Sequence, residues 1–279
     1  MSYKDLLYFY RVLNWKHKIS GIRFLGFAFF GYAWAAKLEI IPLTVNTLAL
    51  LGATLFWYSI NDYFDLKSQN EQNYMATLIK SGKITTQKAL FLCLTPLVLA
   101  PFIFPTGSNL AIFIFFLILT LNFFYSAPPL SFKKRGYWAL IASAIAAPLL
   151  FLESQSVLGK ISLQTVFMAI LISLFFSYLE IIHILEDFQT GEKIKILNSP
   201  RAALKILKIL PFITLVVSFI FSLYNPIFLI TAIFSVVRII SLKNFKKEEV
   251  QKTRRNLLSP RLSLYEFALY ALLSITGHI

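Results

Sequence analysis

The sequence predicts an all-helical, multi-pass membrane protein, on the basis of its composition, its long apolar segments and the placement of its basic residues. Of the 279 residues, 57% are hydrophobic and only 14% are charged, and the mean hydropathy is +0.69. A chain this apolar is atypical of a water-soluble domain. We expect one domain over residues 1–279, built as a bundle of nine transmembrane helices around a central cavity.

Nine apolar segments have close to the length of about 17–25 residues that a helix needs to cross a bilayer about 30 Å thick. A turn signal around Pro226 separates the seventh from the eighth, and no repeat or low-complexity tract interrupts the series. The expected spans are residues 19–37, 43–64, 88–105, 108–126, 137–153, 163–187, 204–224, 226–242 and 262–279.

The basic residues predict how the bundle lies in the membrane. With the N-terminus placed inside, all of the 27 Lys and Arg residues except Lys37 and Lys160 fall in inward-facing regions. A bias of this kind indicates the cytoplasmic side. We therefore expect a cytoplasmic N-terminus, cytoplasmic motif-bearing loops and, after nine crossings, a C-terminus on the opposite side.

Charge and cysteine content exclude several classes of function. The net charge of +14 does not indicate nucleic-acid binding, because the basic residues lie between apolar blocks and not on one face of a soluble domain. Cys93 is the single cysteine, which excludes a disulfide framework and a Cys-based metal site. No cleavable signal peptide is expected. The predicted partners are the lipid bilayer and lipophilic small molecules, with the oligomeric state left open.

The most informative stretch is Asn61-Asp62-Tyr63-Phe64-Asp65, at the end of the second apolar segment. Charged groups in a membrane-spanning helix are costly unless they face a partner, an ion or water, so they mark function by default. On a helix, Asn61, Asp62 and Asp65 can converge on one cation. Such oxygen donors suit Mg²⁺ bridging protein carboxylates to substrate phosphates. The alternative is a capping or interfacial Asp pair without a ligand.

A second acidic stretch lies at the inward end of the sixth segment. Glu180, His183 and Asp187 follow at i, i+3 and i+7, which places two acids and an imidazole on one helix face. We expect this face to meet the first motif across a central cavity open to the cytoplasm, because a shared cation resolves the repulsion between the acids. For His183 we favour a core histidine over a metal ligand. Glu192 and Lys193 either join the site or are solvated loop charges.

Between the two acidic stretches, residues 125–136 form a basic loop after the fourth segment. Two consecutive prolines end the helix and stiffen the connection, and the three cations of residues 133–135 follow at the membrane surface. Such a loop can neutralise a departing diphosphate, although an ordinary positive-inside loop contains a similar run of cations.

Together the three stretches resemble the UbiA superfamily of intramembrane prenyltransferases, and the similarity covers most of the chain. That family has nine transmembrane helices, an NDxxDxxxD motif after the second, a YSxPPLxxK-like loop after the fourth and a second Asp-rich motif after the sixth. The matching residues are Asn61, Asp62, Asp65, Tyr125, Ser126, Pro128, Pro129, Leu130, Lys133 and, in the second motif, Asp187.

The resemblance implies Mg²⁺-dependent transfer of a prenyl group from an allylic polyprenyl diphosphate to a lipophilic acceptor. Electrostatic stabilisation would ease the departure of the diphosphate, and a dry cavity would protect the cation left behind. The implied metal ligands are Asp62, Asp65, Asp187 and Glu192. The implied catalytic residues are the three aspartates with Lys133 and Glu180, the last as a proton acceptor. The implied substrate-binding residues are Asn61, Tyr125, Ser126, Lys133, His183 and Lys193.

Departures from the family pattern leave the acceptor and the reaction open. The third acid of the first motif falls on Gln69, the Arg-Pro pair usual after it is absent from residues 73–84, and the second motif has Gly191 in place of an acid. We favour an aromatic quinone-type acceptor, because no further Arg cluster lies beside the loop. The alternatives are a phosphorylated sugar or glycerol acceptor, a terpene cyclisation, or an inactive family member.

A competing class of function is an ion-coupled transporter. Its path would use the intramembrane acids Asp62, Glu180 and Glu266. The odd number of expected spans, the lack of an inverted repeat and the clustering of acids at one membrane face count against it.

Overall fold

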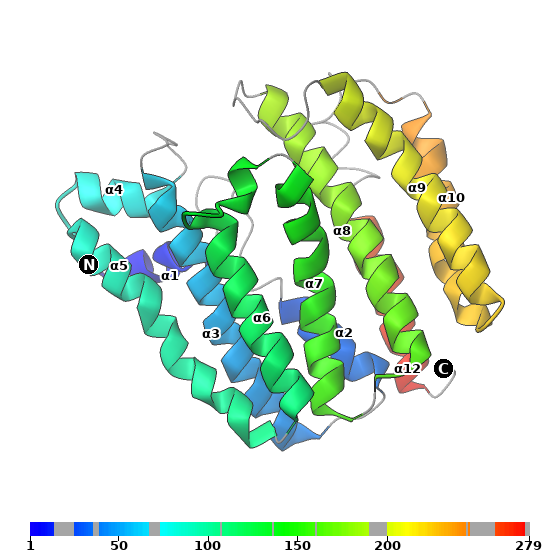
Figure 1. Ribbon diagram of the computed structural model, residues 1–279, viewed down its shortest axis with the longest axis horizontal. Helices are drawn as coiled ribbons and strands as arrows, with labels where there is room; N and C mark the ends of the chain where they lie inside the picture. The colour runs from blue at the N-terminus through cyan, green and yellow to red at the C-terminus, as the bar shows by residue number, and fades with distance from the viewer. Residues whose placement is uncertain are drawn as a thin grey trace.

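The computed structural model describes residues 1–13, 25–35, 39–66, 73–106, 108–135, 137–159, 161–189, 200–243, 245 and 260–276. Every regular element within these ranges is a helix, as predicted. The long helices lie side by side and run between two ends of the molecule (Figure 1). The predicted all-helical class is therefore confirmed.

Six of the described helices are long and apolar enough to cross a membrane. They are α3 (Ile40–Phe64), α5 (Thr86–Leu94) continued by η3 (Thr95–Thr106), α6 (Asn109–Ser126), α7 (Tyr137–Val157), α8 (Leu163–Gln189) and α9 (Pro200–Ser222). Three shorter apolar helices are α2 (Leu25–Trp34), η5 (Pro226–Phe228) continued by α10 (Leu229–Leu242), and α12 (Pro260–Ile275). Each overlaps a predicted segment. The chain is thus a multi-pass membrane protein, and the count of nine spans stays a prediction.

The third predicted span differs from a regular α-helix in its second half. After α5 the chain continues as the 3-10 helix η3, which contains Pro101 and Pro105. Proline has no backbone N–H to donate to the preceding turn, so regular α-helical bonding is interrupted there. The span is still continuous in direction and packs along α3 (Figure 1).

Close helix packing depends on small residues at two contacts. A Cβ atom on Gly52 of α3 would lie 2.6 Å from the carbonyl oxygen of Pro96. One on Gly31 of α2 would lie 2.9 Å from the carbonyl oxygen of Phe151 on α7. Small residues let membrane helices approach closely where burial of apolar surface alone gives little driving force. These glycines therefore allow the α3–η3 and α2–α7 contacts.

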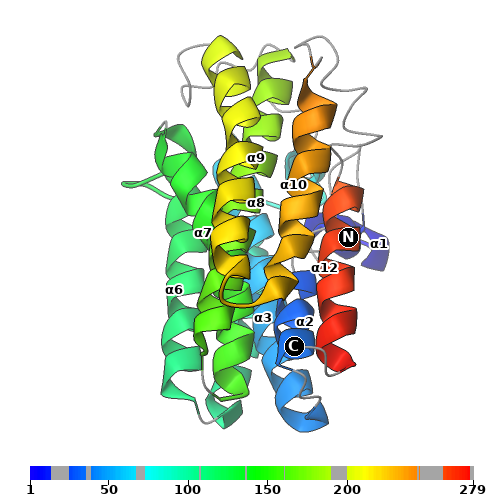
Figure 2. The same ribbon diagram turned by 90° about the vertical axis from the view of Figure 1, so that its right-hand side faces the viewer.

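Helix α7 lies inside the bundle, and α9 and α10 lie at its edge (Figures 1 and 2). Helix α7 packs against α2, α6 and α8, whereas α9 packs between α8 and α10. On α9, Phe212, Val216 and Phe219 are more than half exposed. Exposed apolar side chains of this kind suit a lipid-facing surface and would be a liability in water.

Two short helices lie beside the C-terminal end of α3 (Figure 1). Neither was predicted from the sequence. They are α1 (Tyr3–Phe9) and α4 (Tyr74–Lys80). Asp5 joins them: it forms a capping box with Ser2, accepts a 2.6 Å hydrogen bond from the Tyr74 hydroxyl and lies 3.3 Å from Lys83 Nζ. The Tyr74 hydrogen bond contributes most to a strongly lowered pKa of the Asp5 carboxyl.

Cys93 is fully buried, as the apolar setting of this residue in the sequence predicts. One inference from the basic residues is corrected. Arg238 was counted with the inward-facing loop cations, but it lies within α10, is 5% exposed and forms an ion pair with Glu266 of α12. An Arg in an apolar helix can thus serve packing inside the bundle and not only topology.

Candidate active site

The C-terminal end of α3 carries the first acidic motif. Phe64 is the last residue of the helix and Asp65 is its C-cap. The last carbonyl groups of a helix carry partial negative charge, so carboxylates at this end need cations nearby. One of these carbonyls is satisfied directly, because Nδ2 of Asn73 donates a 2.7 Å hydrogen bond to the main-chain oxygen of Asp62.

Asp62 is paired with Arg11, which the sequence reasoning did not select. The guanidinium of Arg11 donates from Nε to Oδ2 at 3.0 Å and from Nη2 to Oδ1 at 2.5 Å, a two-pronged contact with a buried carboxylate. The guanidinium also lies over the ring of Tyr58, 5.0 Å from its centroid. Arg11 is one of four Lys and Arg residues ahead of the first apolar segment, and no spacing in the sequence connects it with Asp62.

The basic loop after α6 binds the other side of the motif. Lys133 Nζ lies 2.6 Å from Oδ1 of Asp65 and 2.8 Å from Oδ1 of Asn61. The hydroxyl of Ser126, the last residue of α6, donates to the same oxygen of Asn61 at 2.5 Å. Lys133 lies in the short η4 (Phe132–Lys134), which follows the left-handed residue Ser131. The structure thus joins these two predicted stretches.

An aromatic wall, formed by Trp57, Tyr58 and Tyr125, lies one helical turn before the motif. The rings of Trp57 and Tyr58 stack with centroids 5.3 Å apart, and Tyr125 of α6 meets Trp57 edge-on at 6.5 Å. Aromatic faces attract cations and exclude water. Tyr125 was predicted as a substrate-binding residue, whereas Trp57 and Tyr58 were not selected.

The second acidic stretch is described only in part. Helix α8 ends at the same end of the bundle as α3, and its Glu180 is half-buried (Figure 1). The side chains of His183 and Asp187 lie outside the described part of the chain, as do Glu192 and Lys193. The predicted meeting of the two acidic stretches across a central cavity therefore stays a prediction.

Two side-chain cations stand where a metal ion could bind the first motif. We expected Asn61, Asp62 and Asp65 to converge on one cation, but Asp62 binds Arg11 while Asn61 and Asp65 share Lys133. Two carboxylates and an amide oxygen are a donor set that suits Mg²⁺. Within the described ranges, no group of three His, Cys, Asp or Glu residues is placed to hold a metal. These donors fit a metal ion that takes its remaining ligands from substrate phosphates or from the second stretch.

A family-wide sequence comparison matches residues 24–265 to the UbiA prenyltransferase family. The chain belongs to this family. No curated protein sequence matches it.

Solved UbiA structures share the fold. A UbiA homologue from Archaeoglobus fulgidus bound to DMAPP and Mg²⁺ superposes with a TM-score of 0.76 at 18% identity, covering 98% of this chain and 99% of that chain. The same homologue bound to GPP and Mg²⁺ gives the same values. A structure of digeranylgeranylglyceryl phosphate synthase has a TM-score of 0.75 at 17% identity, covering 98% of each chain. At these identities the likeness establishes the helix arrangement.

A cleft of about 640 Å³ lies beside the acidic motif of this UbiA family member. Tyr63 and Phe64 of α3, Ile79 of α4 and the hydroxyl-bearing Ser126 and Ser131 are among its lining residues. Ser126 also donates to Asn61, so the cleft adjoins the motif directly. It offers apolar surface with a few polar groups, which is the usual character of a lipophilic ligand site.

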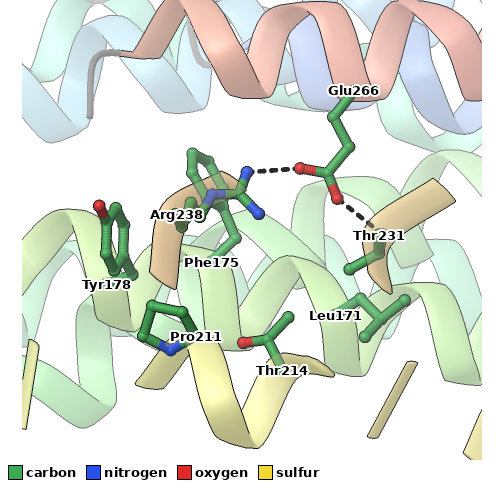
Figure 3. Close-up of a pocket in the computed structure, with 8 residues that line it drawn as sticks. All are labelled: Leu171, Phe175, Tyr178, Pro211, Thr214, Thr231, Arg238 and Glu266. Carbon is green, nitrogen blue, oxygen red and sulfur yellow. Dashed lines mark hydrogen bonds and ion pairs between the residues drawn. The ribbon is translucent and has the colours of Figure 1, made fainter. Parts of the chain in front are cut away.

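A second ion pair lies inside the bundle, away from the motif (Figure 3). Arg238 donates to Oε2 of Glu266 at 2.5 Å, the hydroxyl of Thr231 donates to Oε1 at 2.6 Å, and Tyr270 lies 2.8 Å from that hydroxyl. The cavity beside the pair is about 10 Å³, roughly the space of one water molecule. The negative charge of Glu266 is thus balanced by Arg238, which counts against the ion path that a transporter would need.

Proposed function

We propose that the protein transfers a prenyl group from an allylic polyprenyl diphosphate to a lipophilic acceptor, at the motif end of α3. The observation that carries this proposal is the juxtaposition of two carboxylates, two side-chain cations and an aromatic wall at one end of a membrane-spanning helix. Family membership supports it, as do the DMAPP, GPP and Mg²⁺ bound by solved relatives.

Mg²⁺ is the cofactor of this reaction. Asp62, Asp65 and Asn61 would hold it, with Asp187 from α8 and Glu192 as further ligands. When bound, it supplies positive charge next to the diphosphate as that group departs. A loss of product formation after removal of divalent metal with a chelator, and its return on adding Mg²⁺, tests this requirement.

The diphosphate is bound by the basic residues that now neutralise the motif. Arg11 and Lys133 leave their carboxylates when metal and substrate arrive, and each donates to phosphate oxygens instead. An Arg fork and a Lys ammonium are both suited to phosphate. Ser126 and Asn61 orient the group, since they already share a hydrogen bond beside Lys133. His183 and Lys193 would approach from the second acidic stretch.

The bond changes follow from these positions. The bond between C1 of the prenyl chain and the diphosphate oxygen breaks, and its electron pair leaves with the diphosphate. A carbon of the acceptor forms the new bond to C1, and the acceptor then loses a proton to Glu180 or to water. Tyr58, Trp57 and Tyr125 keep water away from the allylic cation, which water would otherwise convert to an alcohol.

For the acceptor we propose an aromatic ring of the quinone-precursor type. The aromatic wall beside Asp62 offers a stacking surface for such a ring. Of the loop cations, Arg135 donates to the carbonyl of Pro129 and Lys133 is assigned to the diphosphate, and the described lining of the cleft holds one further cation, Lys80 of α4. A phosphorylated acceptor would need a further cation of its own.

The deciding experiment incubates the purified protein with a labelled allylic diphosphate, Mg²⁺ and a mixture of aromatic, glycerol-phosphate and sugar-phosphate acceptors. We expect a product with the mass of a prenylated aromatic compound. Exclusive prenylation of a phosphorylated acceptor would rule out the aromatic acceptor but would leave the proposed prenyl transfer in place. A hydrocarbon formed without acceptor would indicate cyclisation, and ion flux in liposomes without diphosphate turnover would favour transport.

We also propose that the motif end faces the cytoplasm, as the basic residues predict. Single cysteines introduced at exposed positions of α4 and at the α9–η5 turn, in a Cys93→Ala background, would then react with a membrane-impermeant reagent from opposite sides of the membrane. Labelling of the α4 position from outside intact cells would contradict this orientation.

A further inference from the structure

A buried polar cluster lies at the end of the bundle opposite the acidic motif. Glu153 of α7 and Asn46 of α3 are both 0% exposed, and Nδ2 of Asn46 donates to Oε2 of Glu153 at 2.9 Å. Asn46 precedes Asp62 by 16 positions, so the cluster is about 24 Å along α3 from the motif, at 1.5 Å per residue. No step of the proposed reaction uses these residues.

The cluster holds more acceptors than donors. Oε2 of Glu153 accepts from Asn46 and has the Ser154 hydroxyl at 3.4 Å. Oε1 of Glu153 and Oδ1 of Asn46 are buried without a hydrogen-bond partner in the described part of the chain. The ion pairs formed by the described residues do not include Glu153. With the partners that the described residues provide, a charged carboxylate here would be uncompensated inside a membrane-spanning helix, which is strongly unfavourable.

We propose that Glu153 binds a proton, carried on Oε1 and donated to Oδ1 of Asn46. The carboxyl and the amide are both planar and are already joined through Nδ2 and Oε2. A proton on Oε1 therefore closes a cyclic acid–amide pair and satisfies both orphan acceptors at once. It also removes the charge, which is the usual response of an isolated buried acid.

Two further groups bear on the pair. Tyr32 of α2 interacts with both of its side chains, and the Tyr32 hydroxyl donates to the carbonyl of Pro42 at 3.4 Å. The buried hydroxyl of Thr47, the residue after Asn46 on α3, also lacks a partner in the described part of the chain, and oxygen atoms of this kind can bind a monovalent metal ion. A proton needs only the two oxygens that the acid–amide pair already provides.

The neutral pair acts as a cross-link between helices. It joins α3, which carries the acidic motif at its other end, to α7, which packs against α2, α6 and α8. Two residues further along α7, Gln155 donates to the carbonyl of Gly31 on α2. The pair thus fixes α3 within the bundle without placing a charge in the membrane.

The test compares infrared spectra of the full-length protein and of Glu153→Gln. The wild type should show the carbonyl stretching band of a protonated carboxylic acid at neutral pH, and the variant should lack it. The variant should nevertheless unfold at nearly the wild-type temperature, because a Gln amide can donate to Oδ1 and accept from Nδ2 of Asn46. Glu266→Gln is the matched control: it should leave the band in place and lower the unfolding temperature.

Two further variants sharpen the result. Asn46→Leu should shift the band to that of a more weakly hydrogen-bonded acid, and Tyr32→Phe should leave it unchanged. The proposal would be overturned if the wild type lacked the band and unfolded at a higher temperature in a sodium salt than in a choline salt. These two results together would establish a metal site. A Glu153→Gln variant that is as destabilised as Glu153→Ala would also overturn the proposal. None of these readouts depends on prenyl transfer, so failure of the proposed function leaves the test intact.

Discussion

The ion pairs Arg11–Asp62 and Arg238–Glu266 have the same 2.5 Å contact in very different surroundings. Arg11 comes from a short segment beside the bundle, and its side chain is 16% exposed, whereas that of Asp62 is 5% exposed. Arg238 and Glu266 come from α10 and α12, and their side chains are 6% and 5% exposed. We proposed that the first pair exchanges its partners for a metal ion and a phosphate, whereas the second is enclosed by helices.

The difference lies in what surrounds the carboxylate. At Glu266, Thr231 and Tyr270 extend the hydrogen bonding, and the adjacent cavity has room for about one water molecule (Figure 3). At the motif, Asp65 has a 30% exposed side chain, and a cleft of about 640 Å³ adjoins Asn61 through Ser126. We infer that the enclosed pair contributes stability and the accessible pair contributes binding and chemistry.

The largest expected effect is on stability, at the enclosed pair. Arg238→Met leaves the Glu266 carboxylate buried without its cation, so the free energy of unfolding should fall by about 3–5 kcal/mol. Arg238→Met combined with Glu266→Leu should recover most of this loss, because neither charge then remains. Thermal or denaturant unfolding in detergent measures both variants. An Arg238→Met protein as stable as the wild type would refute the structural role of this pair.

The next effect is on turnover, at the accessible pair. Asp62→Ala removes a carboxylate that we propose as a Mg²⁺ ligand and should lower kcat by roughly 10²-fold or more, the usual cost of losing one preorganised electrostatic group. Glu266→Gln is its counterpart and should keep the turnover of the folded fraction. Full activity in Asp62→Ala would contradict the assignment of the motif.

A smaller effect tests whether Arg11 is an exchangeable partner. Arg11→Ala removes the cation that competes with metal at Asp62, so the Mg²⁺ concentration for half-maximal activity should fall, by up to about tenfold. The KM for the allylic diphosphate should rise if, as we propose, the same guanidinium binds phosphate. Lys4→Ala, which removes an exposed cation from α1, is the control and should change neither value. Unaltered Mg²⁺ dependence in Arg11→Ala would mean that Arg11 stays on Asp62 during turnover.

The smallest effect concerns the α1–α4 contact that supports Arg11. The pKa of Asp5 is lowered from its ordinary value of 3.8, chiefly by the Tyr74 hydrogen bond, so the ionised carboxylate stabilises the folded state. This stabilisation is complete well above pH 3.8 and is lost as the pH falls below it. Asp5→Asn should therefore unfold at a lower temperature than the wild type at neutral pH, with the difference vanishing in strong acid. An equal difference at both pH values would exclude the charge of Asp5 as its cause.

The sequence by itself determined the class of the protein, the position of its apolar segments and the residues of the acidic motif. These features are local: a span is set by the length and hydropathy of one segment, and Asn61, Asp62 and Asp65 are neighbours on one helix. The resemblance carried by the motif and the loop likewise led to the right family. Helix α8, for example, begins at residue 163, which is also where the predicted sixth segment begins.

Only the tertiary structure decided the partners of the charged residues. Arg11 meets Asp62 across 51 positions of sequence, Lys133 meets Asp65 across 68, and Arg238 meets Glu266 across 28. Such pairings depend on which helices pack together and at what depth, and hydropathy does not encode this. The same holds for Glu153, which forms no ion pair with the described residues and meets Asn46 only because α3 and α7 pack together. The chemical state of a buried acid is therefore a property of helix packing.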